Sequence, residues 1–212
     1  MFRVARADSV LRFSTIRADV SGRDNEGNRF DVPGGGVLYA ATTAQGALAE
    51  VTAAFRPSAS LRQLMAEAGA TADEFAVSTL DASWRAPRVV GTLRSRDALP
   101  FIDIEAAETH TYLTEHARTV LIGLGVPALD VAAVRGPSRL LTRGLATWIY
   151  QAVNETGDPL YGGIRYLSRL STDYECWAIF DETPVELVDE RRITIDDPDL
   201  VAVAERHGFR LS

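Results

Sequence analysis

Short apolar runs, separated by polar and glycine-rich stretches, predict a domain that mixes strands and helices. Because strands and helices do not alternate regularly, we expect a mixed α/β (α+β) fold rather than a doubly wound parallel sheet. This fold would form a single domain over residues 1–212, with a mixed β-sheet core flanked by helices. The predicted strands cover residues 2–6, 37–41, 75–80, 88–90, 164–167 and 176–180, and the predicted helices cover residues 44–55, 60–69, 105–122, 138–154 and 198–207.

Polar stretches between these elements indicate loops. Residues 21–28, Ser-Gly-Arg-Asp-Asn-Glu-Gly-Asn, form the clearest one. Gly34-Gly35-Gly36 precedes the second strand, where glycine permits unusual backbone angles or the close approach of a ligand. Thr42 or Thr43 is the expected N-cap of the helix that follows that strand.

Charge and composition exclude several classes of function. The chain carries a formal net charge of −7, which argues against direct nucleic-acid binding because phosphate backbones attract basic surfaces. All 22 basic residues are arginine. A lysine Schiff base and a phosphate-binding-loop lysine are therefore both excluded.

The sequence contains no apolar run of the roughly 20 residues that a membrane helix needs, and its start does not resemble a signal peptide. We therefore expect a cytoplasmic protein without a membrane partner. Cys176 is the only cysteine, so an intrachain disulfide is excluded, and its apolar neighbours predict a buried structural thiol. His110, His116 and His207 do not have the spacing of metal ligands, and we expect no metal.

Four separated residues carry the candidate chemistry: Arg29, Tyr39, Glu50 and Ser168. An arginine can hold phosphate oxygens at two points, and a tyrosine ring can stack on an aromatic ligand. A fixed carboxylate can stabilise the positive charge that grows on a sugar when its ring substituent leaves. Ser168 lacks the surroundings of a hydrolase nucleophile and fits either a ribose or phosphate contact or an ordinary turn. Each residue alone also fits a structural role.

The order of these residues resembles the RES domain, a bacterial toxin family named for its Arg, Glu and Ser. Residues 31–36 are richer in glycine than the family's pattern. The matching segments are Phe2-Arg3-Val4, Arg29-Phe30, Leu38-Tyr39-Ala40, Ala47-Leu48-Ala49-Glu50, residues 140–168 with Gly163-Ile164-Arg165-Tyr166-Leu167-Ser168 at their end, and residues 175–180.

The resemblance implies a fold related to ADP-ribosyltransferase toxins and an enzyme that consumes NAD as its substrate. The nicotinamide–ribose bond would be cleaved by hydrolysis, or by phosphorolysis with inorganic phosphate as co-substrate. It also implies that Arg29 holds phosphates, Tyr39 stacks on nicotinamide, Glu50 stabilises the ribosyl cation and Ser168 contacts the nicotinamide ribose. Arg3 is a further candidate for phosphate binding.

The family's usual partner is an Xre-type, DNA-binding antitoxin that covers the active site. Arg165, Arg169 and the loop before Tyr39 are the expected contact points, and a homodimer is a further expectation. Two alternatives remain open. One is a mono-ADP-ribosyltransferase that uses the same residues on a protein target, and the other is a binding domain without enzymatic activity.

Overall fold

The computed structural model describes residues 1–69, 78–96 and 99–212, and it confirms the mixed α/β class. The described strands are β1 (Phe2–Arg6), β2 (Val37–Ala41), β3 (Thr79–Leu80), β4 (Arg88–Ser95), β5 (Phe101–Asp103), β6 (Gly163–Leu167), β7 (Glu175–Phe180), β8 (Val185–Arg192) and β9 (Arg210–Leu211). The described helices are α1 (Ala44–Val51), α2 (Ala59–Ala68), α3 (Ala82–Arg85), α4 (Ala107–His116), α5 (Arg118–Gly123), α6 (Val131–Arg135), α7 (Arg139–Tyr150) and α8 (Pro198–His207).

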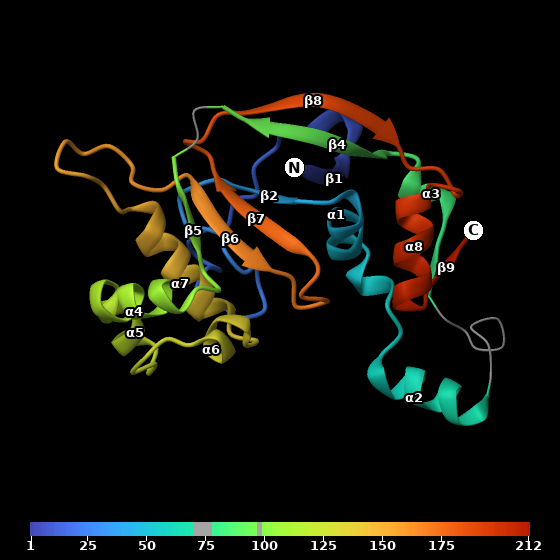
Figure 1. Ribbon diagram of the computed structural model, residues 1–212, viewed down its shortest axis with the longest axis horizontal. Coiled ribbons are helices and arrows are strands. Elements are labelled where there is room, and N and C mark those ends of the chain that lie inside the picture. The colour runs from blue at the N-terminus through green and yellow to red at the C-terminus, as the bar shows by residue number, and fades with distance from the viewer. Residues whose placement is uncertain (70–77, 97–98) are drawn as a thin grey trace. The chain divides into compact units, whose positions relative to one another are not determined.

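The main sheet is mixed, as the sequence predicted. Among the described residues its strand order is β5-β6-β7-β2-β1-β4-β8 (Figure 1). Strand β5 runs parallel to β6, whereas β7 runs antiparallel to β6 and β4 antiparallel to β1. The chain also divides into two compact units made of separated segments: residues 1–10, 41–93 and 187–212 form unit 1, and residues 11–40 and 94–186 form unit 2.

Unit 1 contains α1 packed against β1 and α8 (Figure 1). The side chain of Thr43 accepts a hydrogen bond from the Gly46 N–H (3.0 Å), which confirms one of the two predicted N-caps. Ala47, Leu48 and Ala49 are buried on this helix, so its apolar positions hold it in the core. Helix α8 begins at Pro198, as expected for the first helical turn.

Unit 2 builds a core between β5–β6–β7 and a group of helices. Figure 1 shows α4, α5, α6 and α7 gathered together beside β5 and β6. Helix α7 buries Leu141, Leu145 and Ile149, which recur every four residues and form one apolar face. Ser138 caps this helix by accepting the Leu141 N–H.

Several predicted boundaries are wrong. The helix expected over 105–122 divides at Ala117 into α4 and α5, although Leu113, Ala117 and Leu121 are all buried and continue one apolar pattern across the break. The predicted helix over 138–154 ends at Tyr150, and that over 44–55 ends at Val51 with a 3-10 turn after it.

Other elements were absent from the prediction. Strand β8 is largely exposed and rich in charge, so no apolar run marks it in the sequence. The short elements β5, β9, α3 and α6 each contain five residues or fewer and leave little periodic signal. Residues 75–77 of one predicted strand lie outside the described residues, and the described remainder contains β3.

Candidate functional site

The candidate residues belong to both units. Arg29, Tyr39 and Ser168 are part of unit 2, whereas Arg3 and Glu50 are part of unit 1. Within unit 2 the structure brings Arg29 and Tyr39 together through Phe30, whose backbone N–H donates to the Tyr39 hydroxyl (3.1 Å).

Tyr39 is a partly exposed residue with an anchored hydroxyl. It lies in β2, and its hydroxyl donates to Asp31 Oδ1 (2.9 Å). Burial of the hydroxyl and the negative charge of Asp31 raise the pKa of Tyr39 well above its usual value. The hydroxyl therefore stays protonated and serves as an anchor, which leaves the ring as the part of Tyr39 suited to stacking.

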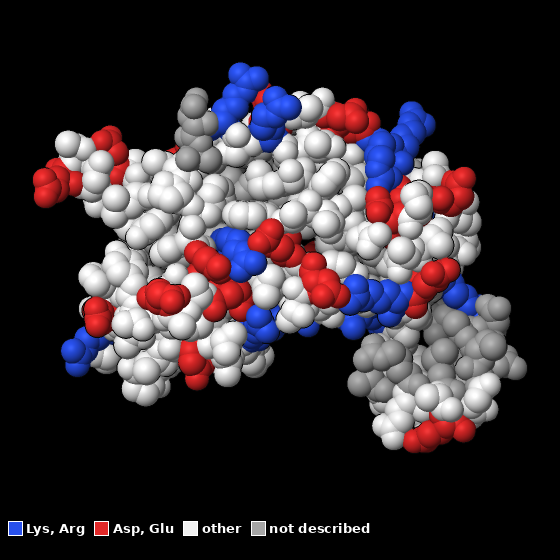
Figure 2. Space-filling model, in the orientation of Figure 1, with Lys and Arg blue, Asp and Glu red and all other residues white. Residues whose placement is uncertain are grey.

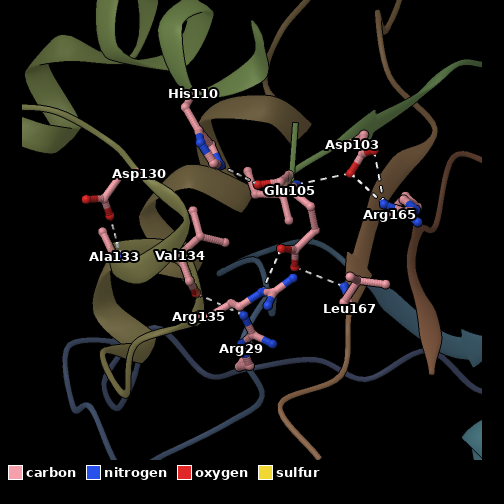
Figure 3. Close-up of polar contacts among 11 residues, drawn as sticks. Arg29, Asp103, Glu105, His110, Asp130, Ala133, Val134, Arg135, Arg165 and Leu167 are labelled. Atoms are coloured by element: carbon pink, nitrogen blue, oxygen red, sulfur yellow. Dashed lines mark hydrogen bonds and ion pairs between the residues drawn. The ribbon is translucent and has the colours of Figure 1, made fainter. Parts of the chain in front are cut away.

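Arg29 is held against aromatic rings. Its guanidinium carbon lies 5.0 Å from the centre of the Phe30 ring and 5.4 Å from that of Tyr166, within the range of cation–π attraction. Its Nη2 also donates to the Val134 carbonyl (2.9 Å), at the end of α6. Figure 3 shows this contact next to Arg135. These contacts fix the Arg29 guanidinium in one place.

The neighbouring charges are largely paired with one another (Figure 3). Arg135 Nε donates to Glu105 Oε2 (2.8 Å), and the other oxygen of Glu105 accepts from the Leu167 N–H (3.0 Å). Arg165 joins Asp103 on β5 to Glu175 on β7. Glu105 thereby ties the end of β6 to α6.

Two arginines of α7 hold the loop that precedes Arg29. Arg143, which is 3% exposed, donates to the carbonyls of Glu26 (2.7 Å) and Arg23 (2.6 Å). Arg139 donates to the Gly27 carbonyl (2.6 Å). Since these carbonyls belong to the predicted loop 21–28, charge-assisted hydrogen bonds hold the loop against α7.

The segment Gly34-Gly35-Gly36 has structural reasons for its glycines. Gly34 has a φ of +85°, a conformation that other residues rarely adopt. A Cβ on Gly35 would lie 2.9 Å from the Tyr150 ring, and one on Gly36 would lie 2.8 Å from Asp181 Oδ2. Of the two explanations expected for these glycines, the unusual backbone angle therefore holds at Gly34, and close approach by protein groups applies at Gly35 and Gly36.

Ser168 lies in the turn after β6 and is 3% exposed. Its Oγ accepts from the Leu170 N–H (3.0 Å), and its own N–H donates to the Tyr174 carbonyl (2.9 Å). This is the geometry of a turn serine, one of the two roles that its sequence context left open. Contact with a ribose stays a prediction.

Glu50 and Arg3 occupy regular elements of unit 1. Glu50 is an exposed residue near the end of α1, directly after the buried Ala49. Arg3 is a partly exposed residue of β1 and pairs with Gly91 of β4. Exposure leaves the Glu50 carboxylate accessible from solvent.

Comparison with protein families finds a match to the RES domain over residues 1–201. The chain belongs to the RES domain family. Neither the curated proteins nor the solved structures compared with it give a match. Membership in the RES family supports the toxin class of toxin–antitoxin systems and an association with NAD-acting enzymes.

The sequence interpretation missed Asp31, Arg143 and Glu105, which position parts of this RES domain. Asp31 had a visible signal, because a carboxylate stands between the apolar residues Phe30 and Val32. Arg143 interrupts the apolar positions of a predicted helix, but the loop carbonyls that it contacts are distant in sequence.

Three further features concern the cysteine, the metal-ligating residue types and the lengths of the helices. Cys176 is buried in β7, as predicted for a structural thiol. Across the described ranges, no cluster of three or more His, Cys, Asp and Glu side chains has the arrangement of a metal site. No described helix is both long and apolar enough to cross a membrane. On the face drawn in Figure 2, arginines lie among carboxylates.

Proposed function

We propose that this RES domain is an NAD-consuming toxin enzyme that cleaves the nicotinamide–ribose bond. The observation that carries the proposal is the arrangement of Tyr39 and Arg29, on a strand and on the loop before it. Tyr39 is a partly exposed residue whose hydroxyl is tied down, and the Arg29 guanidinium is fixed against Phe30 and Tyr166. A stacking surface beside an immobilised positive charge suits a ligand that carries both an aromatic ring and phosphates.

Arg29 and Tyr39 would bind rather than transfer protons. An arginine remains charged at physiological pH, and the raised pKa of Tyr39, caused by burial and by Asp31, keeps its hydroxyl protonated. In the proposed reaction Tyr39 stacks on nicotinamide and Arg29 holds phosphate oxygens. Arg3 is proposed as a second phosphate contact.

Glu50 would supply the electrostatic stabilisation. As the nicotinamide ring departs, positive charge develops on the anomeric carbon of the ribose, and a nearby carboxylate lowers the free energy of that state. Removing such a group raises the barrier by about 2.7–4 kcal/mol, or about 10²- to 10³-fold in rate. Ser168 is proposed to contact the ribose.

The acceptor of the ribosyl group is either water or inorganic phosphate. The deciding experiment measures nicotinamide release from NAD by the purified protein, with and without phosphate. Release that requires phosphate would identify phosphorolysis, and release without it would identify hydrolysis. Nicotinamide release accompanied by labelling of a protein with ADP-ribose, without free ADP-ribose or its phosphorylated form, would favour a mono-ADP-ribosyltransferase instead.

A matched pair of variants tests the role of Glu50. We expect Glu50→Ala to lower kcat by about 10²- to 10³-fold. Glu205→Ala is the control, because Glu205 is also an exposed glutamate on a helix of unit 1. An equal loss of rate in both variants would contradict the assignment of Glu50. No release by the unsubstituted protein under any condition would leave NAD binding without turnover as the better description.

The partner proposed from the family is an Xre-type antitoxin. Arg169 is exposed, whereas Arg165 is engaged by Asp103 and Glu175. Arg169 is therefore the better candidate for a contact with a partner. Reduced affinity of Arg169→Ala for a co-expressed antitoxin, measured by titration calorimetry, would support this contact.

A further inference from the structure

A buried carboxylate joins the loop of Arg29 to the strand of Tyr39. Asp31 is 1% exposed. Its Oδ1 accepts from the Tyr39 hydroxyl (2.9 Å), and its Oδ2 accepts from the Asn28 backbone N–H (2.7 Å) and the Ser14 hydroxyl (3.4 Å). The Asn28 side-chain amide donates to the same carboxylate (3.2 Å). One side chain thus collects hydrogen bonds from a loop, a strand and the segment before them.

The environment of Asp31 is made for a negatively charged group. Among the described residues, Asp31 forms none of the ion pairs. Its oxygens are instead surrounded by hydrogen-bond donors, and both Asp31 and Arg143 lie close to Gly27. A Cβ on Gly27 would lie 3.0 Å from Asp31 Oδ2 and 3.4 Å from Arg143 Nη1. A buried carboxylate is tolerated where donors of this kind surround it.

The hydrogen-bond donors around Asp31 also explain why an asparagine at this position could not make the same contacts. A carboxylate only accepts hydrogen bonds, whereas an asparagine side chain replaces one acceptor with an NH₂ donor. At this position the NH₂ group would face either the Tyr39 hydroxyl or the Asn28 N–H. The Tyr39 hydroxyl already accepts from the Phe30 N–H (3.1 Å), so its proton needs an acceptor on the other side.

We propose that Asp31 is a positioning residue, which sets the orientation of the Tyr39 ring and of the turn that carries Arg29. This inference rests on the proposed function, in which Tyr39 and Arg29 bind NAD. Asp31 does not touch the substrate and acts through the Tyr39 hydroxyl and the Asn28 N–H. Loss of its carboxylate frees the ring to tilt and weakens substrate binding.

A second carboxylate–tyrosine pair of unit 2 provides a matched control. Asp181 accepts from the Tyr150 hydroxyl (3.0 Å) and from the Gly36 N–H (2.8 Å). It therefore makes the same two kinds of contact as Asp31, a tyrosine hydroxyl and a backbone N–H. Unlike Asp31, however, Asp181 is exposed and contacts none of the candidate residues in its described hydrogen bonds.

The test is a double-mutant cycle read in KM and kcat for nicotinamide release, and in NAD binding by calorimetry. We expect Asp31→Asn and Tyr39→Phe each to raise KM on the order of ten-fold, with a smaller change in kcat. In the double variant the effects should be less than additive, because both substitutions break the same hydrogen bond, that between Tyr39 and Asp31. Asp181→Asn and Tyr150→Phe should leave KM within about two-fold of the unsubstituted value.

Three outcomes would overturn the inference. They are additive effects in the double variant, an unchanged KM in a folded Asp31→Asn variant, and an equal rise of KM in the Asp181 control. Should Asp31→Asn fail to fold, Asp31→Glu keeps the charge but displaces its oxygens, and the same rise in KM is expected. An unchanged KM in the folded Glu variant would then contradict the proposal.

Different experimental results would contradict the positioning role of Asp31 and the proposed enzymatic function. If NAD binds without nicotinamide release, the enzymatic proposal fails, and the cycle is read from NAD affinity alone. If Asp31→Asn releases nicotinamide with an unchanged KM, the enzymatic proposal stands and the positioning role is wrong. If NAD neither binds nor reacts, both are wrong.

Discussion

Two neighbouring segments of unit 2 are held in place in different ways. The loop 21–28 is fixed by the buried charged side chains of Arg143 and Asp31, which bind its backbone. In the segment Gly34–Gly36, Tyr150 and Asp181 instead fill the space where side chains would stand at Gly35 and Gly36, and Asp181 adds one hydrogen bond from the Gly36 N–H. Polar anchoring orients specific groups, whereas close packing only demands small residues. The loop is therefore the segment suited to presenting a candidate binding residue such as Arg29.

Among the substitutions that test this comparison, we expect the largest loss of stability from a substitution of Arg143. Arg143→Met removes buried, charge-assisted hydrogen bonds to the Glu26 and Arg23 carbonyls, and we expect the free energy of unfolding to fall by about 3 kcal/mol. We also expect KM for NAD to rise, since the loop presents Arg29. Urea unfolding and steady-state kinetics would measure these changes.

Arg139→Met is the matched control for that prediction. Arg139 also donates to loop carbonyls, those of Asn25 and Gly27, but it is only partly buried. Its loss should lower the free energy of unfolding by about 1 kcal/mol. Equal effects of the two substitutions would show that burial of the guanidinium does not matter to the loop.

The glycine segment should respond to added volume. Gly35→Ala would place a methyl group 2.9 Å from the Tyr150 ring, and overpacking of this kind costs about 2 kcal/mol. Thermal unfolding measures this cost when Gly35→Ala is compared with the unsubstituted protein and Gly35→Ala/Tyr150→Ala is compared with Tyr150→Ala. Recovery of stability in the double variant, relative to Tyr150→Ala alone, would confirm a steric origin, and persistent loss would refute it.

Gly34, Gly35 and Gly36 show how much of the structure could be predicted from the sequence. Their position predicted an unusual backbone or the close approach of a ligand. The unusual backbone occurs at Gly34, whereas protein side chains approach Gly35 and Gly36, and two of these, Tyr150 and Asp181, are more than 100 residues away in sequence. Arg29 and Tyr39 were predicted from local motifs and lie in one connected arrangement. Asp31 was not predicted, because its role depends on Ser14 and Tyr39 folding onto it. The charged β8 was missed because exposed strands lack an apolar pattern.

Gly34 should show a smaller effect of a different kind. Its φ of +85° favours glycine, yet a Cβ there would meet no atom within 4 Å. Gly34→Ala should therefore lower the free energy of unfolding by about 1 kcal/mol through backbone strain alone. Gly34→Asn should be less harmful, because asparagine adopts positive φ more readily. Equal stability of Gly34→Ala and the unsubstituted protein in urea would contradict a strain at this position.

The smallest expected effect lies in the alkaline stability of the glycine segment. Burial and the hydrogen bond to Asp181 raise the pKa of Tyr150 from 10.0 to about 12. Between these values the folded state binds more protons than the unfolded state, so this contribution is present below pH 10 and is lost as the pH rises toward 12. Tyr150→Phe lacks the titrating group, and its free energy of unfolding should fall less steeply over that interval. Identical slopes in urea titrations of the two proteins would contradict a raised pKa of the Tyr150 hydroxyl in the folded state.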